Sequence, residues 1–150
     1  MNLLENLKLL LQEATSYIDT PEETDKGILV IPVKREIIVS ADSFSSFYRM
    51  FMSLQRKLGL ETYIKMVIGD GDVEAWHTLT FQVDISGLHR DRLLSFFHPD
   101  VTKDQAKESI DYLFGHQWNE EQIQREIGIS QITLYRYKTG NFRQPTENPN

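Results

Sequence analysis

The stretch "WNEEQIQREIGISQITLYRYKTG", residues 118–140, predicts two short helices joined by a tight turn. Asn119 is a suitable N-cap for the first helix, and two glutamates follow it in the first turn, where the helix dipole favours negative charge. Gly128 should end this helix, because glycine adopts a left-handed backbone conformation at little cost. Ser130 is the expected N-cap of the second helix, and Gly140 should close it. The stretch therefore predicts a pair of helices hinged at a glycine.

The second of these helices should have one buried side and one outward side. At about 100° per residue, Leu134 and Tyr137 share the inward side. The outward side carries Gln131, Ile132, Tyr135, Arg136 and Thr139. This mixture suits the edges of DNA bases, because glutamine pairs with adenine, arginine pairs with guanine or phosphate, and isoleucine contacts the thymine methyl group.

The same stretch resembles the helix-turn-helix of the Cro/repressor-like family of bacterial and phage regulators. The matching residues are Ile123, Ile127, Gly128, Ile129, Ser130, Leu134, Tyr137 and Gly140. The resemblance covers residues 118–140, or about 103–143 with the preceding helix. One departure is Gln124, where the family usually has alanine, and its longer side chain should point outward or widen the helix crossing.

By this resemblance the helix from Gln131 to Lys138 is the recognition helix, and the helix that starts at Glu120 lies across the DNA backbone. The candidate DNA-binding residues are Ser130, Gln131, Ile132, Thr133, Tyr135, Arg136, Lys138, Thr139 and Arg143.

Charge sets a condition on this interpretation. The formal net charge of −6 argues against a general polyanion binder. From Ile129 onward, however, Arg136, Lys138 and Arg143 stand against Glu147 alone, so the last segment has a local positive balance. The glutamates of the preceding helix should therefore face away from phosphate.

The first hundred residues mix helix and strand patterns. Leucines at helical spacing predict a helix over residues 3–14, and residues 19–27 read as a charged loop. Pro32 favours an edge position for the strand that contains it. Residues 28–33 and 36–41 are expected as two short strands or one bent strand, and residues 62–68 and 74–85 as two further strands. The expected helices run from Asp42 to Gly59 and from Leu88 to Phe97.

From Thr102 onward the pattern is helical only, which places a domain boundary near residue 100. We therefore expect an α+β domain over residues 1–100, with a small antiparallel sheet and helices. An all-α helix-turn-helix domain over residues 101–143 should follow, and residues 144–150 should form a flexible tail.

Several chemical functions find no support in the sequence. The chain has no cysteine, which fits a reducing cytoplasm, and no apolar run approaches the length of a membrane span. The four histidines lack paired metal spacing, and the "GDGDVE" turn has too few oxygen ligands for calcium. The tripeptide at residues 98–100 resembles the His-Pro-Asp of J-domain co-chaperones, but the long basic helix of that family is missing. We expect no enzyme activity, metal or cofactor.

The expected function is sequence-specific binding of double-stranded DNA by a bacterial, phage or plasmid transcriptional regulator. Apolar faces at residues 3–14 and 44–58 predict a homodimer through the first domain. That domain could instead hold a small ligand or a protein partner. The alternative is a protein-binding inhibitor or adaptor that acts through its acidic first domain, with an auxiliary, autoregulatory helix-turn-helix.

Overall fold

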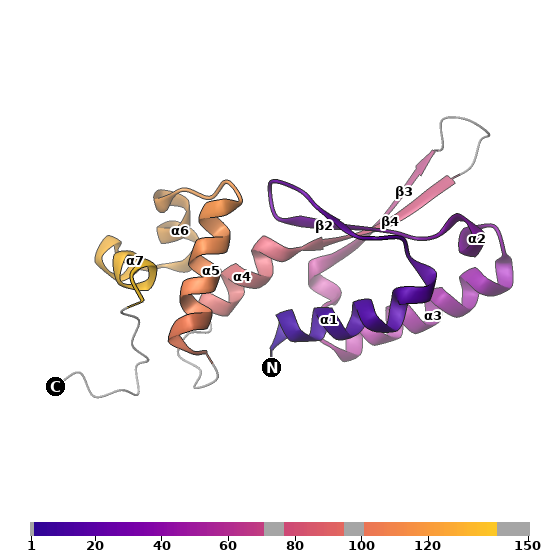
Figure 1. The fold of residues 1–150 in the computed structure, drawn as a ribbon, viewed down its shortest axis with the longest axis horizontal. Coiled ribbons are helices and arrows are strands. Elements are labelled where there is room, and N and C mark those ends of the chain that lie inside the picture. Colours follow the sequence, from indigo (N-terminus) through magenta and orange to yellow (C-terminus); the bar gives the residue numbers. More distant parts are fainter. Residues whose placement is uncertain (1, 71–76, 95–100, 141–150) are drawn as a thin grey trace. The chain divides into compact units, whose positions relative to one another are not determined.

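The chain forms two compact units. The computed structural model describes residues 2–70, 77–94 and 101–140 (Figure 1). One unit, the sheet unit, comprises Met1–Thr24 and Ile28–Ile85, and the other, the helical unit, comprises Asp25–Gly27 and Ser86–Asn150. The expected tail and Arg143 lie outside the described residues, as do residues 71–74 of "GDGDVE" and the tripeptide at 98–100.

The sheet unit is built on a four-stranded antiparallel sheet. Its strand order is β1-β2-β4-β3. The strands are β1 (Glu22–Glu23), β2 (Ile28–Pro32), β3 (Ile64–Asp70) and β4 (His77–Asp84). This arrangement confirms the small antiparallel sheet and the mixed α+β class that the sequence predicts.

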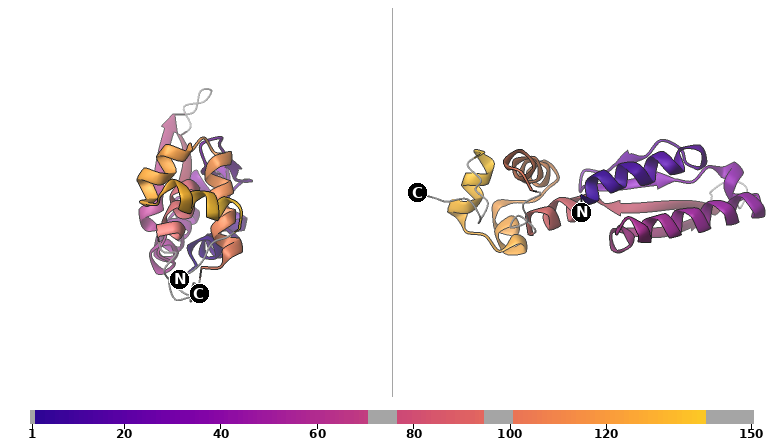
Figure 2. Two further views of the ribbon diagram at one scale, coloured as in Figure 1. Left: turned by 90° about the vertical axis from the view of Figure 1, so that its left-hand side faces the viewer. Right: turned by 90° about the horizontal axis from the view of Figure 1, so that it is seen from below.

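Two helices cover one face of this sheet. Helices α1 (Leu3–Ala14) and α3 (Ala41–Lys57) lie on the same face, as two perpendicular views show (Figures 1 and 2). The rings of Phe47 and Phe51 meet the ring of Phe81 on β4, with centroids 6.1 and 4.4 Å apart. Leu79 and Val83 are buried beside Phe81, so every second residue of this part of β4 faces the core.

Two local expectations for this unit are wrong. Residues 36–41 were expected as a strand, but Arg35–Ile38 form the single helical turn α2, which packs against α3 and β4. Two backbone hydrogen bonds close this turn: the Ile37 N–H donates to the Lys34 carbonyl, and the Val39 N–H donates to the Arg35 carbonyl. Tertiary packing here overrides the strand preference of β-branched residues. Helix α3 also begins earlier than expected, because Ser40 rather than Asp42 is its N-cap.

The charged loop at residues 19–27 contains a strand that its sequence does not reveal. Glu22 and Glu23 of β1 pair with Val30 and Leu29, so β2 is an internal strand rather than an edge. Pro32 is tolerated there because its carbonyl accepts from the Asp19 N–H at 2.9 Å, a contact that needs no N–H from the proline.

The described regular elements of the helical unit are all helices. They are α4 (Ile85–Leu94, whose first residue belongs to the sheet unit), α5 (Lys103–Gly115), α6 (Glu120–Ile127) and α7 (Gln131–Lys138). Their buried core consists of Leu93, Val101, Ala106, Ile110, Leu113, Ile123, Ile127, Leu134 and Tyr137.

The division between the units falls between Ile85 and Ser86, earlier than the expected boundary near residue 100. Leu93 of α4 is fully buried in the helical core, which ties α4 to the helices that follow it. The segment Asp25–Gly27 joins the same unit, because the Ser86 hydroxyl donates to the Lys26 carbonyl at 3.0 Å. No helix among the described residues is both long and apolar enough to cross a membrane.

Candidate DNA-binding surface

Helices α6 and α7 meet at a turn that follows the predicted capping pattern. Asn119 caps α6 by accepting from the Gln122 N–H at 2.8 Å. Gly128 has φ 78°, a left-handed conformation, and its N–H donates to the Gln124 carbonyl at 2.8 Å. Ser130 caps α7 by accepting from the Thr133 N–H at 3.1 Å. The turn is therefore determined by residues within a few positions of one another.

Helix α7 presents an outward face while two side chains hold it to the core. Leu134 is only 1% exposed and Tyr137 is also buried, as predicted. Ile132 and Tyr135, by contrast, are 66% and 65% exposed. Gln131 and Arg136 are exposed beside them. These four residues, Gln131, Ile132, Tyr135 and Arg136, form the reading face of α7.

The hydroxyl groups of three candidate residues, Ser130, Thr133 and Thr139, form hydrogen bonds within α7 or at its ends. The Ser130 hydroxyl donates to the Thr133 hydroxyl at 2.9 Å, while Ser130 also caps the helix. The Thr139 hydroxyl donates to the carbonyls of Tyr135 and Arg136 at 3.0 and 3.2 Å. The cap at Ser130 was predicted, whereas the local hydrogen bonds of the Thr133 and Thr139 hydroxyls were not.

Lys138 is held against the preceding helices. Its ammonium group lies 3.7 Å from a carboxylate oxygen of Glu120 and 4.6 Å from the centre of the Phe114 ring. This surface ion pair competes with any contact between Lys138 and phosphate. Lys138 therefore stands apart from the reading face, although the sequence places it in the same candidate set.

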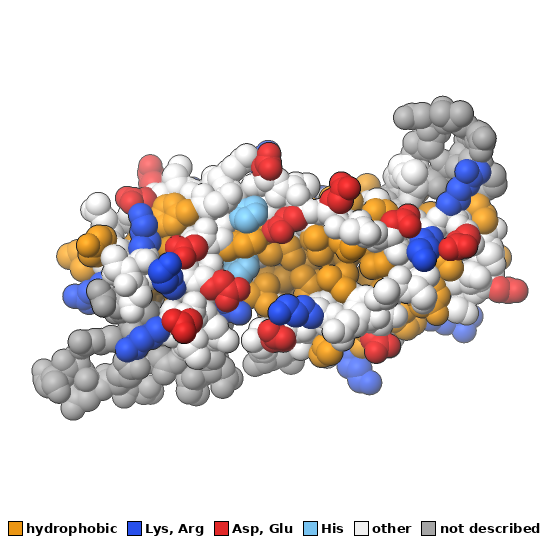
Figure 3. Space-filling model, in the orientation of Figure 1, with side chains coloured by type: hydrophobic (Ala, Val, Ile, Leu, Met, Phe, Trp, Pro, Cys, Tyr) orange, Lys and Arg blue, Asp and Glu red, His pale blue; other side chains and the backbone are white. Residues whose placement is uncertain are grey.

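Acidic side chains surround the turn. Glu120, Glu121 and Glu126 of α6 are all exposed, and Gln124 is half-buried rather than fully outward. On the visible face of the helical unit, at the left of Figure 3, basic and acidic side chains are interspersed. This pattern is unlike the continuous basic surface of a general polyanion binder.

The helical unit also contains a buried polar cluster that sequence reasoning missed. The Nδ1 atom of His89 on α4 lies 2.9 Å from the Ser109 hydroxyl on α5, and Nη1 of Arg92 lies 3.3 Å from the same oxygen. The His89 ring stacks on Tyr112, with centroids 4.1 Å apart, and Tyr112 stacks on His116 at 3.8 Å. No spacing motif could reveal this cluster, because twenty residues separate His89 from Ser109.

The cluster has a structural rather than a nucleophilic geometry. A serine beside a histidine is the pairing that activates a hydroxyl, but Ser109 is completely buried, so no substrate can reach it. Burial, together with the nearby charges of Arg92 and His116, lowers the pKa of His89 to about 4. His89 is therefore neutral in the folded unit near neutral pH.

We expect the helical unit to lose stability as the pH falls from 6.5 towards 4. The unfolded chain takes up a proton at His89 near pH 6.5, whereas the folded unit resists protonation until about pH 4. The full loss below that range is on the order of 3 kcal/mol, at 1.36 kcal/mol per pKa unit. Urea denaturation across this range should show the loss. His89→Gln should flatten the pH profile, whereas His116→Gln should largely keep it; equal profiles for both variants would contradict the assignment.

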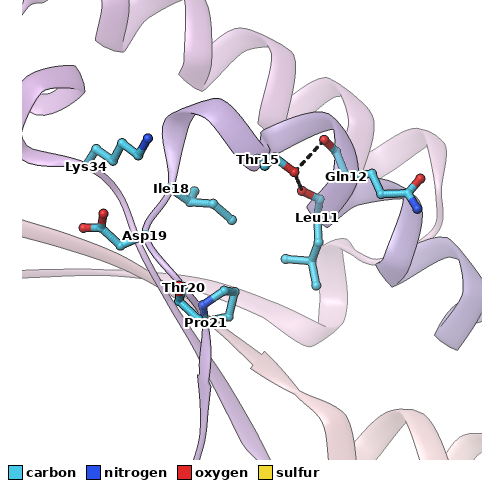
Figure 4. Close-up of a pocket in the computed structure, with 8 residues that line it drawn as sticks. All are labelled: Leu11, Gln12, Thr15, Ile18, Asp19, Thr20, Pro21 and Lys34. Carbon is cyan, nitrogen blue, oxygen red and sulfur yellow. Dashed lines mark hydrogen bonds between the residues drawn. The ribbon is translucent and has the colours of Figure 1, made fainter.

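A hollow in the sheet unit bears on the expected small-ligand site. It has a volume of about 550 Å³ and is lined by Leu11, Gln12, Thr15, Ile18, Asp19, Thr20, Pro21 and Lys34 (Figure 4). The polar ends of Gln12, Asp19 and Lys34 point in different directions rather than toward one another. The Thr15 hydroxyl bonds to the carbonyls of Leu11 and Gln12. The polar groups therefore do not converge on one position, as they do in a built ligand site.

The chain matches no family model, no curated protein and no solved structure. Among the residues that the structure describes, no group of three or more candidate ligands could hold a metal ion.

Proposed function

We propose that this protein binds DNA in a sequence-specific manner by placing α7 in the major groove. One observation carries the proposal: α7 exposes four adjacent side chains suited to base recognition, while Leu134 and Tyr137 anchor its other side in the core. A helix that is anchored on one side and projects polar and apolar groups from the other has the form of a recognition helix.

Each member of the reading face supplies a different kind of contact. The Gln131 amide can donate to and accept from adenine, and the Arg136 guanidinium can donate two hydrogen bonds to guanine. The Ile132 side chain can pack against a thymine methyl group. Tyr135 offers an apolar ring with a hydroxyl that can reach a base or a phosphate. Such a mixture discriminates between sequences better than a row of lysines would.

The acidic surroundings favour specific over non-specific binding. Exposed glutamates on α6 repel phosphate, and Glu120 partly neutralises Lys138. Non-specific affinity comes from neutralising phosphates, so this protein should bind random DNA weakly. Its affinity for a preferred site would depend more on base contacts than that of a basic protein.

Transcriptional regulation in the cytoplasm of a bacterium, with a phage or plasmid as an alternative source, is the role this activity would serve. One recognition helix reads only a few base pairs, so useful affinity generally requires two copies on adjacent half-sites. The sheet unit would then bring the two copies together. The adaptor alternative assigns the main role to the sheet unit and leaves α7 with an auxiliary one.

Selection from a random duplex library, followed by footprinting of the enriched sequence, tests the proposal. Arg136→Ala should weaken binding to that sequence by about 1–3 kcal/mol if Arg136 contacts a base with two hydrogen bonds. Its thermal stability should hardly change, because Arg136 is exposed. A contact with phosphate alone would instead weaken all sequences alike and lower the salt slope by about one unit.

Lys107→Ala is the matched control, since it also removes one exposed positive charge but lies on α5 and pairs with Asp111 at 2.6 Å. It should leave specific binding nearly unchanged. Equal losses for the two variants would show that net charge, not the reading face, determines binding. If no duplex is enriched even at low salt, the DNA-binding proposal fails and the adaptor alternative remains.

A further inference from the structure

The outer edge of β3 differs from the other edge of the sheet. Strand β3 pairs with β4 along all seven of its residues, and no other described strand pairs with its outer side (Figure 1). The opposite edge consists of β1, which has two residues, both exposed glutamates. Short and charged edges resist pairing with another strand, whereas a long apolar edge invites it. Of the two sheet edges among the described residues, the β3 edge is therefore the one suited to a further strand.

The apolar face of the sheet continues onto β3 beyond its helical cover. Met66 lies opposite the buried Phe81 and Ile68 lies opposite the buried Leu79, so all four side chains share one face. Yet Met66 and Ile68 are 42% and 64% exposed. The rings of α3 reach β4 but leave these two side chains uncovered. A partner at this edge would gain both backbone hydrogen bonds and apolar contacts.

We propose that the occupant is a second copy of this chain, paired antiparallel through β3 about a two-fold axis at Val67. In that register Val67 faces its own counterpart, and Met66 faces Ile68 of the second copy. Each copy thus covers the exposed apolar side chains of the other. A two-fold interface requires such a self-complementary surface.

Charge also fits this register. Lys65 is the only charged residue between Ile64 and Gly69. The two-fold axis at Val67 places it opposite Gly69 of the second copy, which has no side chain to obstruct it. A register shifted to pair Lys65 with itself would bring like charges together, which is destabilising. Self-pairing through β1 would likewise set glutamates against glutamates.

This interface differs from the one that the sequence predicts. The leucine and phenylalanine faces of α1 and α3 were expected to leave apolar surface for a partner, but Leu7, Leu10, Phe47 and Phe51 are buried in the sheet unit itself. The proposed dimer forms without DNA, so it goes beyond the proposed function. It also supplies the two copies that DNA binding would use.

Single-cysteine variants of the full chain test the register directly, because the chain has no cysteine of its own. The two copies of Val67 would have Cα atoms about 4.5–5.5 Å apart, within the range for a disulfide. The two copies of Lys65 would lie about 13 Å apart along the strands. Copper-phenanthroline oxidation should therefore cross-link Val67→Cys but not Lys65→Cys. Cross-linking of Lys65→Cys as efficiently as Val67→Cys would overturn the register.

Analytical ultracentrifugation at high micromolar concentration tests the dimer itself. The wild type should sediment as a dimer, and Ile68→Lys should weaken self-association on the order of tenfold or more, because a charge would enter an apolar contact. Leu9→Lys, at an exposed apolar position on α1, is the control and should leave the dimer intact. A monomeric wild type, or equal effects of both variants, would overturn the proposal. A dimer that binds no DNA would refute only the proposed function.

Discussion

Leu134→Ala should lower the free energy of unfolding of the helical unit by about 2–5 kcal/mol. Leu134 is 1% exposed and packs in the same buried cluster as Ile123 and Ile127 of α6. Truncation removes apolar contacts and leaves a cavity that the surrounding helices can only partly fill. Because few side chains anchor the short α7, its orientation should loosen as well. Specific DNA binding should then fall together with stability.

The measurement is guanidinium unfolding followed by tryptophan fluorescence. The chain has two tryptophans, so a Trp76→Phe background leaves Trp118, which packs against the helical core, as the reporter of this unit. Ile132→Ala is the matched control on the same helix; it should change stability by no more than about 0.5 kcal/mol, because Ile132 is largely exposed. Similar losses for both variants would mean that α7 turns a different side to the core.

Phe51→Ala should destabilise the sheet unit by about 3–5 kcal/mol. Phe51 is completely buried, and its ring centroid lies 5.2 Å from that of Phe47 and 4.4 Å from that of Phe81. It therefore joins α3 to the central strand β4, and its removal leaves a large cavity between helix and sheet. The loss of these aromatic contacts lowers the stability further, beyond the effect of the lost buried area.

Thermal unfolding monitored by circular dichroism would give this loss, with Tyr48→Ala as the control. Tyr48 lies on the same helix but is exposed, so its truncation should have a much smaller effect. The unfolding transition of the helical unit, followed by Trp118 fluorescence, should hardly shift in the Phe51→Ala variant, since Phe51 belongs to the other compact unit. A Tyr48→Ala variant as unstable as Phe51→Ala would contradict the packing of α3.

Much of the helical unit could be predicted because its signals are local. The caps at Asn119 and Ser130 and the left-handed Gly128 each depend on backbone groups within four residues. The burial of Leu134 and Tyr137 follows from helical periodicity alone. The same reasoning holds for α1. The reading face could be named in advance for this reason, although its binding to DNA stays a prediction.

Other features depend on residues that are distant in the chain. The segment expected as a strand at residues 36–41 forms α2 because it packs against α3 and β4, and β1 forms because β2 lies beside it. The boundary moved to Ser86 because Leu93 fills the helical core. The His89 cluster and the contact between Lys138 and Glu120 likewise join different helices.

The sequence by itself determined where α1, α6 and α7 begin and end and which sides they bury, since neighbouring residues set capping and periodicity. Only the tertiary structure decided which groups meet across elements. It placed Lys138 beside Glu120, left Met66 and Ile68 uncovered at the edge of the sheet, and buried His89 against Ser109. These outcomes depend on the packing of whole elements, because desolvation and shape act between surfaces that are remote in sequence.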